Sequence, residues 1–258
     1  MNINKQLLFE DVEKPGKKYP PSASEEITLR YALALNYASN KDVLELGFGY
    51  GYGIKTILKI AKSYYGIDYL HENVDALKKK YHQKFNDNFQ INQGDAQKTL
   101  LNDKCKDLII AFAIIYYLDF DIFLEECSRV LKNNGKLIFC QTNPDHKYFQ
   151  PSRNTISYYT NSEILTKLKK YGFKATVLAK IEDTKNYKNN ISNLKNFFSS
   201  NSLLKNILIF LRKQLLYKKI PDILPIDSYQ SELGKLKEIN KDTNLTDIRV
   251  MYFVCSKL

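Results

Sequence analysis

The chain has 258 residues, with 39 Lys and Arg against 28 Asp and Glu, and a formal net charge of +11. This length suits one α/β domain with additions, and the longest uncharged apolar run, 108–118, is too short to cross a bilayer. The four cysteines lie far apart in sequence, so no pair has the spacing of a metal site and we expect no metal centre. Residues 1–15 lack the apolar core of a signal peptide, so we expect a cytoplasmic protein.

Strand and helix patterns alternate from about residue 24 to residue 181. Ser22 and Glu25 have the spacing of a capping box, which predicts a helix that reaches Tyr37. Strict alternation is typical of a mostly parallel sheet with helices on both faces, in which ligands bind at the carboxyl ends of the strands. The predicted strands are 42–46, 63–67, 88–92, 106–112, 136–141, 173–181 and 248–256. The predicted helices are 52–62, 71–82, 96–101, 120–132 and 161–171, with a turn at Asn133-Asn134-Gly135 before the fifth strand.

The alternation divides the chain into three parts. Residues 1–22 form an N-terminal segment, residues 23–181 with 247–258 form the alternating domain, and residues 182–246 interrupt it. In the first part, the sequence PGKKYPP either closes over a ligand, with Tyr19 stacking on it, or is an extended linker.

The positive charge is concentrated in the interrupting part. Between Thr184 and Pro221 there is no acidic residue, whereas eight basic residues occur there. Apolar residues recur at helical spacing within this stretch, from Leu204 to Leu215. Such a basic amphipathic helix either packs on the domain or on a second subunit, or lies on an anionic membrane surface.

Four alternating glycines occur in the sequence VLELGFGYGYG, residues 43–53, as Gly47, Gly49, Gly51 and Gly53. Glycine lets the backbone turn sharply out of a strand and pass close to a ligand. The dinucleotide fingerprint Gly-x-Gly-x-x-Gly fails, because Tyr52 stands at its sixth place. An acid two residues before Gly-x-Gly-x-Gly instead favours S-adenosylmethionine (SAM) over NAD or a flavin. The alternative is a tight turn that binds no ligand.

Acidic residues at three predicted strand ends extend this site. Glu45 is expected to accept a hydrogen bond from the ammonium group of SAM, Asp68 from both ribose hydroxyls, and Asp95 from the adenine amino group. The strand 106–112 ends beneath the expected position of the sulfonium. The predicted cofactor-binding residues are Tyr19, Glu45, Gly47, Gly49, Gly51, Asp68, Tyr69, Asp95, Ala96 and Phe112.

On these motifs, the chain resembles the class I SAM-dependent methyltransferases over about residues 22–181 and the last strand. The resemblance implies a Rossmann-like, seven-stranded, mostly parallel sheet with helices on both faces and an antiparallel last strand. SAM is the implied cofactor and S-adenosyl-L-homocysteine the product.

A narrower resemblance concerns bacterial methyltransferases associated with surface-glycan gene clusters, such as those for capsule or lipopolysaccharide. Residues 30–53 are similar to theirs, with Glu26 just upstream, and the resemblance implies transfer to a sugar hydroxyl. Three histidines of that family are absent here. Their places hold Ile27, Tyr117 and the segment 154–157.

Methyl transfer to a hydroxyl requires a group that removes the acceptor's proton. His146, in the loop after the fifth strand, is the predicted base, with Asp145 beside it and Tyr117 facing the site from another strand end. The alternative is that His146 is a loop residue without this role.

The sequence therefore predicts a SAM-dependent O-methyltransferase that acts on a nucleotide sugar or surface glycan, with an anionic acceptor. A homodimer and peripheral contact with the inner face of an anionic membrane are further expectations. A nucleic-acid or small-molecule methyltransferase is the first alternative, but residues 111–114 lack the Asn/Asp-Pro-Pro-Tyr motif of enzymes that methylate nucleic-acid bases, so we do not expect nucleic acid as the acceptor. The second alternative is a non-catalytic SAM-fold subunit that binds a partner through residues 182–246.

Overall fold

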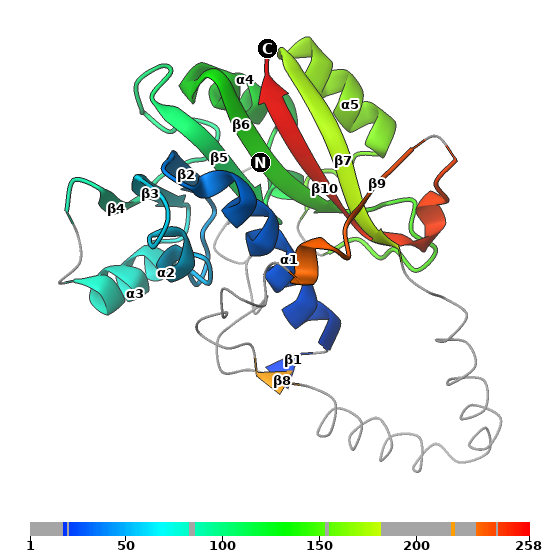
Figure 1. Cartoon of the computed structure of the whole chain (residues 1–258), viewed down its shortest axis with the longest axis horizontal. Coiled ribbons are helices and arrows are strands. Elements are labelled where there is room, and N and C mark those ends of the chain that lie inside the picture. Colours follow the sequence, from blue (N-terminus) through cyan, green and yellow to red (C-terminus); the bar gives the residue numbers. More distant parts are fainter. Residues whose placement is uncertain are drawn as a thin grey trace.

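The computed structural model describes residues 18–19, 21–82, 86–152, 155–181, 218–219, 231–240 and 242–258. Its main feature is an eight-stranded sheet with the order β4-β3-β2-β5-β6-β10-β7-β9 (Figure 1). The strands are β2 (Asp42–Leu46), β3 (Ser63–Asp68), β4 (Phe89–Gln93), β5 (Lys106–Phe112), β6 (Leu131–Thr142), β7 (Phe173–Ile181), β9 (Lys237–Glu238) and β10 (Ile248–Lys257).

The sheet is parallel from β4 to β6, and β10 lies antiparallel between β6 and β7. This confirms the predicted Rossmann-like sheet with an antiparallel last strand. The number of strands is eight rather than seven, because β9 pairs with the outer edge of β7. A strand of two residues is too short to produce a periodic sequence pattern.

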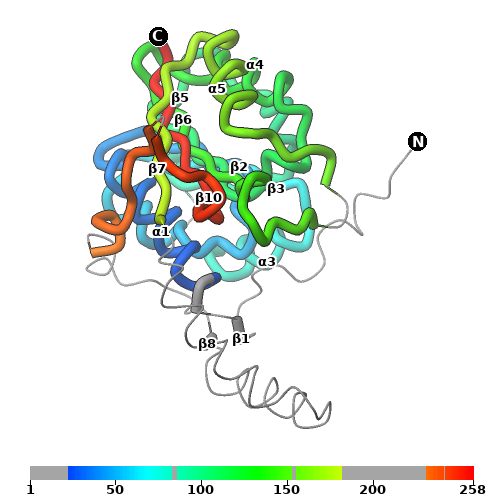
Figure 2. The backbone as a smooth tube through the Cα atoms, turned by 90° about the vertical axis from the view of Figure 1, so that its right-hand side faces the viewer, coloured from blue at the N-terminus to red at the C-terminus, as the bar shows by residue number. Residues whose placement is uncertain are grey.

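Helices cover both faces of the sheet, as predicted. The helices are α1 (Pro21–Ala38), α2 (Ile54–Ile57), α3 (His71–Tyr81), α4 (Phe120–Val130) and α5 (Asn161–Lys170). Figure 2 shows α4 and α5 grouped together, apart from α1 and α3. Alternate residues of β5 enter two separate cores: Leu108 and Ile110 pack with α1 to α3, whereas Ile109 and Ala111 pack with α4 and α5.

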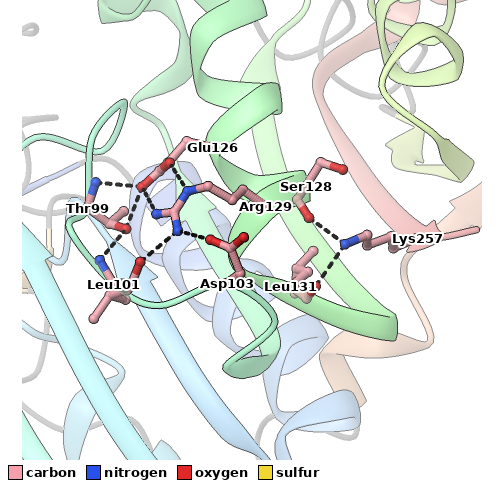
Figure 3. Close-up of polar contacts among 8 residues, drawn as sticks. All are labelled: Thr99, Leu101, Asp103, Glu126, Ser128, Arg129, Leu131 and Lys257. Carbon is pink, nitrogen blue, oxygen red and sulfur yellow. Dashed lines mark hydrogen bonds and ion pairs between the residues drawn. The ribbon is translucent and has the colours of Figure 1, made fainter.

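The predicted helix over 96–101 is wrong. The side chains of α4 hold this segment in turns, because the backbone N–H and hydroxyl of Thr99 both donate to Glu126, and Arg129 donates to the carbonyl of Leu101 (Figure 3). Arg129 also pairs with Asp103 at 2.6 Å. The backbone N–H groups of Gln97, Thr99 and Leu101 donate to side chains and so form no helical hydrogen bonds.

Three smaller predictions also need correction. The helix predicted over 52–62 is only α2. β6 begins at Leu131, before the predicted turn at 133–135, which lies where the register against β5 shifts, with Asn134 at φ +63°. The capping box is wrong because α1 already begins at Pro21. The Glu25 carboxylate instead pairs with Lys180 at 2.6 Å and with Lys235 at 3.0 Å.

The N-terminal segment and the interrupting part meet in a two-stranded ribbon. In it, β1 (Lys18–Tyr19) pairs antiparallel with β8 (Lys218–Lys219) below α1 (Figure 1). The predicted amphipathic helix near 204–215 lies outside the described residues, as does Asn154. Within the described part of the chain, no helix is both long and apolar enough to cross a membrane.

Candidate functional site

The glycine loop leaves β2 in a backbone conformation that other residues rarely adopt. Gly47, Gly49 and Gly51 have φ angles of +72°, +54° and +71°. A Cβ atom on Gly47 would lie 2.5 Å from Cγ2 of Ile114, so side chains fill the space on that side. A Cβ atom on Gly49 would meet nothing within 4 Å. The loop therefore forms a cradle that is open at Gly49, where a ligand can approach the backbone.

Asp68 lies against this loop at the carboxyl end of β3. Its Oδ2 atom accepts a hydrogen bond from the backbone of Gly49 at 2.7 Å, and its Oδ1 atom accepts from the backbone of Leu70 and from Asn73. The side chain is buried, and burial raises the pKa of its carboxyl group although these bonds lower it. The structure thus brings together Asp68 and Gly49. The contact of Asp68 with the ribose stays a prediction.

Glu45 is buried beneath the loop and bonded to two tyrosines that the sequence did not assign to the site. Oε1 accepts from the hydroxyl of Tyr31 at 2.8 Å and Oε2 from that of Tyr64 at 2.5 Å. Burial raises the pKa of Glu45 to about 7, against the lowering effect of both hydroxyls. Its carboxylate thus connects α1 to β3, and its contact with the cofactor's ammonium stays a prediction. Ile27 and Ala34 place Tyr31 on the buried face of α1, which was the available signal.

The other predicted cofactor residues lie at neighbouring strand ends. Asp95 follows β4 in a turn, where its Oδ1 atom accepts from the backbone of Gln97 at 2.9 Å. Ala96 is buried on the face of α4 and α5. Phe112 ends β5. Its ring and the ring of Tyr31 are nearly perpendicular, with 5.5 Å between the ring centroids.

Two tyrosines, Tyr69 and Tyr19, complete the set of predicted cofactor-binding residues. Tyr69 follows β3 and is 43% exposed. The backbone of Tyr19 lies in β1, but its side chain is outside the described part of the structure. The stacking of Tyr19 on the cofactor and the cofactor contact of Tyr69 stay predictions.

An aromatic cluster follows β5 on the side where an acceptor is expected. Tyr116 lies 4.6 Å from Tyr117 and 5.2 Å from Tyr158 between ring centroids, and it stacks on the latter. The backbone of Ile156 donates to the carbonyl of Tyr116 at 2.7 Å, which fixes the two loops together. Burial raises the pKa of Tyr117, so its hydroxyl is protonated at neutral pH and is a hydrogen-bond donor rather than a base.

The predicted catalytic pair, His146 and Asp145, lies in the loop after β6. His146 is buried, and its Nδ1 atom accepts from the backbone of Tyr148 at 3.3 Å. In this arrangement a neutral ring carries its proton on Nε2, which suits a donor toward a ligand on that side. The exposed Asp145 instead lines an open cavity of about 480 Å³ with residues of α5, such as Ser162 and Lys169. The base role of His146 stays a prediction.

The arrangement fits a cationic nucleotide ligand. Among the described residues, neither Glu45 nor Asp68 pairs with Lys or Arg, although both are buried. The groups that bond to them are hydroxyls, backbone N–H groups and one amide. A ligand with its own positive charge would supply the missing counter-charge beside the open cradle at Gly49. Within the same described ranges, no three His, Cys, Asp or Glu side chains are grouped to hold a metal.

Comparison with known proteins finds a family match for the part of the chain that contains the glycine loop. Residues 44–139 match the family model described as a methyltransferase domain. A protein of Mycolicibacterium smegmatis named "Probable S-adenosylmethionine-dependent methyltransferase" is 31% identical over 126 residues, which cover 48% of this chain and 46% of that protein. The fatty-acid O-methyltransferase of the same organism is 28% identical over 142 residues, with 51% and 50% covered. The chain therefore spans about half the length of these curated relatives.

The fold also resembles solved structures. Phosphoethanolamine N-methyltransferase 2 of Haemonchus contortus, solved in complex with S-adenosyl-L-methionine, superposes with a TM-score of 0.57 at 14% identity, covering 98% of this chain and 55% of the other. At this identity the likeness concerns the fold alone. The family match includes the glycine loop, Asp68 and Tyr117, whereas α1 and His146 lie outside it.

Proposed function

We propose that this chain, whose residues 44–139 form a class I SAM-dependent methyltransferase domain, transfers the methyl group of SAM to a hydroxyl of a sugar. The observation that supports SAM as the methyl donor is the open backbone cradle at Gly49 beside the buried carboxylate of Asp68. Each of these groups lies at the carboxyl edge of the sheet, where ligands of open α/β folds bind.

The chain's own residues bind the donor and align the acceptor. When bound, SAM supplies an activated methyl group on a sulfonium. Asp68 holds the ribose, the glycine loop admits the amino-acid part, and Phe112 closes the base of the site. Alignment of this kind contributes several kcal/mol to methyl transfer. The hydroxyl of Tyr117 orients the acceptor oxygen, and His146 is the residue to which we assign removal of its proton.

The aromatic cluster of Tyr116, Tyr117 and Tyr158 supports a sugar as acceptor. Ring faces pack well against the C–H faces of sugars, and phenolic hydroxyls bond to sugar hydroxyls. The similarity of residues 30–53 to glycan-associated methyltransferases points in the same direction. We infer an anionic acceptor, such as a nucleotide sugar, from the excess of basic residues between 184 and 221.

An apolar acceptor with a terminal hydroxyl or carboxyl is the second candidate. One relative is named a fatty-acid O-methyltransferase. Tyr148 and Ile156, which lie in the two loops beside the cluster, are 64% and 63% exposed. Such side chains would favour a lipid-like acceptor at the membrane surface.

The test combines binding with turnover. Calorimetry first measures SAM binding, and radiolabelled SAM is then supplied with nucleotide sugars, with surface oligosaccharides and with fatty acids in parallel. The proposal expects label in a sugar product, and loss of label in Asp68→Ala but not in the control Asp103→Ala. Label only in fatty acids would replace the sugar by the second candidate. Binding of SAM without transfer to any acceptor would favour a non-catalytic subunit.

A further inference from the structure

Tyr31 of α1 contacts the glycine loop, although it lies outside residues 44–139, which match the family model. Its side chain is buried, its hydroxyl donates to Glu45, and its ring meets Phe112. We propose that Tyr31 is a positioning residue for cofactor binding, which holds Glu45 with its hydroxyl and the end of the glycine loop with its ring. This inference rests on the proposed function and adds a part of the site that the family match does not include.

The fit between Tyr31 and Gly53 is the first argument. Gly53 has φ −85° and ψ −20°, a right-handed conformation that any residue adopts. Its backbone therefore does not require glycine. A Cβ atom at this position would lie 1.9 Å from Cε1 and 2.1 Å from Cδ1 of Tyr31. The fourth glycine is thus needed because the ring of Tyr31 lies directly against the loop.

The charge of Glu45 is the second argument. The titratable groups that face it are Tyr31 from α1 and Tyr64 and Asp68 from β3, and Tyr81 of α3 lies near Tyr64. The two hydroxyls stabilise the ionised carboxylate, whereas burial and the charge of Asp68 oppose it. With its pKa raised to about 7, Glu45 changes charge close to neutral pH. Loss of the Tyr31 hydroxyl would raise this pKa further.

These contacts predict how pH affects SAM binding. SAM carries a positive sulfonium, so an ionised Glu45 beneath the loop favours it. Binding should therefore weaken as the pH falls through about 7. The ammonium group of SAM also titrates near this range, but it does so equally for every variant of the protein.

The experiment measures the Kd of SAM from pH 6 to pH 9 for the wild type and Tyr31→Phe, which removes the hydroxyl and keeps the ring against Gly53. We expect the midpoint of the pH dependence to move upward by about one pH unit, and affinity at pH 7.5 to fall about threefold. The two curves should converge at high pH. Tyr37→Phe is the matched control, because this tyrosine of the same helix contacts Lys136 instead, and its curve should coincide with that of the wild type.

Three further variants keep the inference testable if Tyr31→Phe folds poorly. Tyr64→Phe removes the other hydroxyl and should also move the midpoint upward. Gly53→Ala should weaken SAM binding at every pH. The double variant with Tyr31→Leu should regain part of the lost affinity, because the smaller side chain makes room for the added methyl group.

The outcomes separate this inference from the proposed function. Equal weakening at every pH in Tyr31→Phe, or a curve that coincides with that of the wild type, would overturn the positioning role and leave the proposed function standing. A wild-type protein that does not bind SAM at any pH would overturn both.

Discussion

Carboxylates occur at both edges of the sheet, buried at the carboxyl edge and partly buried at the amino edge, and they are stabilised in opposite ways. At the carboxyl edge, Glu45 and Asp68 receive bonds from hydroxyls, backbone N–H groups and an amide, and the pKa of each is raised by burial. At the amino edge, Asp42 and Asp107 share the ammonium group of Lys132 at 2.9 Å and 3.0 Å. The pKa of Asp42 is well below its ordinary value, since hydrogen bonds from Lys132, Ser63 and Lys62 outweigh its partial burial.

The difference separates a structural cluster from a binding site. A buried carboxylate without a cation costs free energy, and proteins usually avoid the arrangement. Within the described residues, the amino edge carries lysines for its acids and the carboxyl edge does not. The same residue types thus serve stability at one edge and leave room for a positively charged ligand at the other.

The largest expected effect on SAM affinity is at Asp68. Asp68→Ala removes the acceptor for the Gly49 backbone and the proposed acceptor for the ribose, so the affinity for SAM should fall by about 1.5–3 kcal/mol. Calorimetric titration measures it. Asp42→Ala is the control from the other edge, and should lower stability while it leaves this affinity unchanged. Equal SAM affinity in Asp68→Ala and the wild type would remove Asp68 from the site.

The stability of Glu45→Gln should depend less on pH than the stability of the wild type. Because the folded pKa of Glu45, about 7, lies above the unfolded value of 4.5, its contribution is fully present below pH 4.5 and is lost as the pH rises through 7. The wild type should therefore lose about 3 kcal/mol more than Glu45→Gln over this range. Urea unfolding at several pH values measures the difference. Parallel curves for the two proteins would show that Glu45 does not titrate in this window.

A substitution at Gly49 should weaken SAM binding more than it lowers the stability of the fold. Gly49→Ala should cost about 1 kcal/mol of stability from its positive φ and should weaken SAM binding at least about tenfold, because the methyl group enters the open side of the cradle. Gly51→Ala adds a clash, since its Cβ would lie 2.8 Å from side-chain atoms of Ile54 and Leu77. It should therefore lose more stability than Gly49→Ala. The opposite order in thermal unfolding would contradict the described cradle.

The smallest effect concerns the amino edge. Lys132→Met should lower stability by no more than about 1 kcal/mol, because its side chain is 36% exposed and solvent screens the pairs. The loss should be present near neutral pH and should diminish only as the pH falls well below 3.8, the ordinary pKa of Asp42, because the depressed pKa keeps this group ionised in the folded protein. Urea unfolding at pH 7 and at a series of pH values below 3.8 tests the sign. A change in SAM affinity would mean that the two edges are coupled.

The sequence predicted the strands well because buried parallel strands are continuous apolar runs, as in 106–112. It predicted a helix at 96–101 wrongly, because Glu126 and Arg129, distant in sequence, bond to this segment's backbone. The glycine loop and Asp68 were identifiable from spacing alone. The pairing of Glu45 with Tyr31 and Tyr64 was not, since it depends on how α1 packs across β2 and β3.

The central position of β10 has a consequence for synthesis on the ribosome. β7 joins the sheet only through β10, which pairs with β6 on its other side. At ordinary translation speeds, residues 182–257 take roughly 4–15 s to follow β7. During that time the edges of β6 and β7 that will face β10 have no neighbouring strand, and exposed edges can pair with other chains. Nascent chains stalled before residue 248 should therefore be protease-sensitive and bind chaperones.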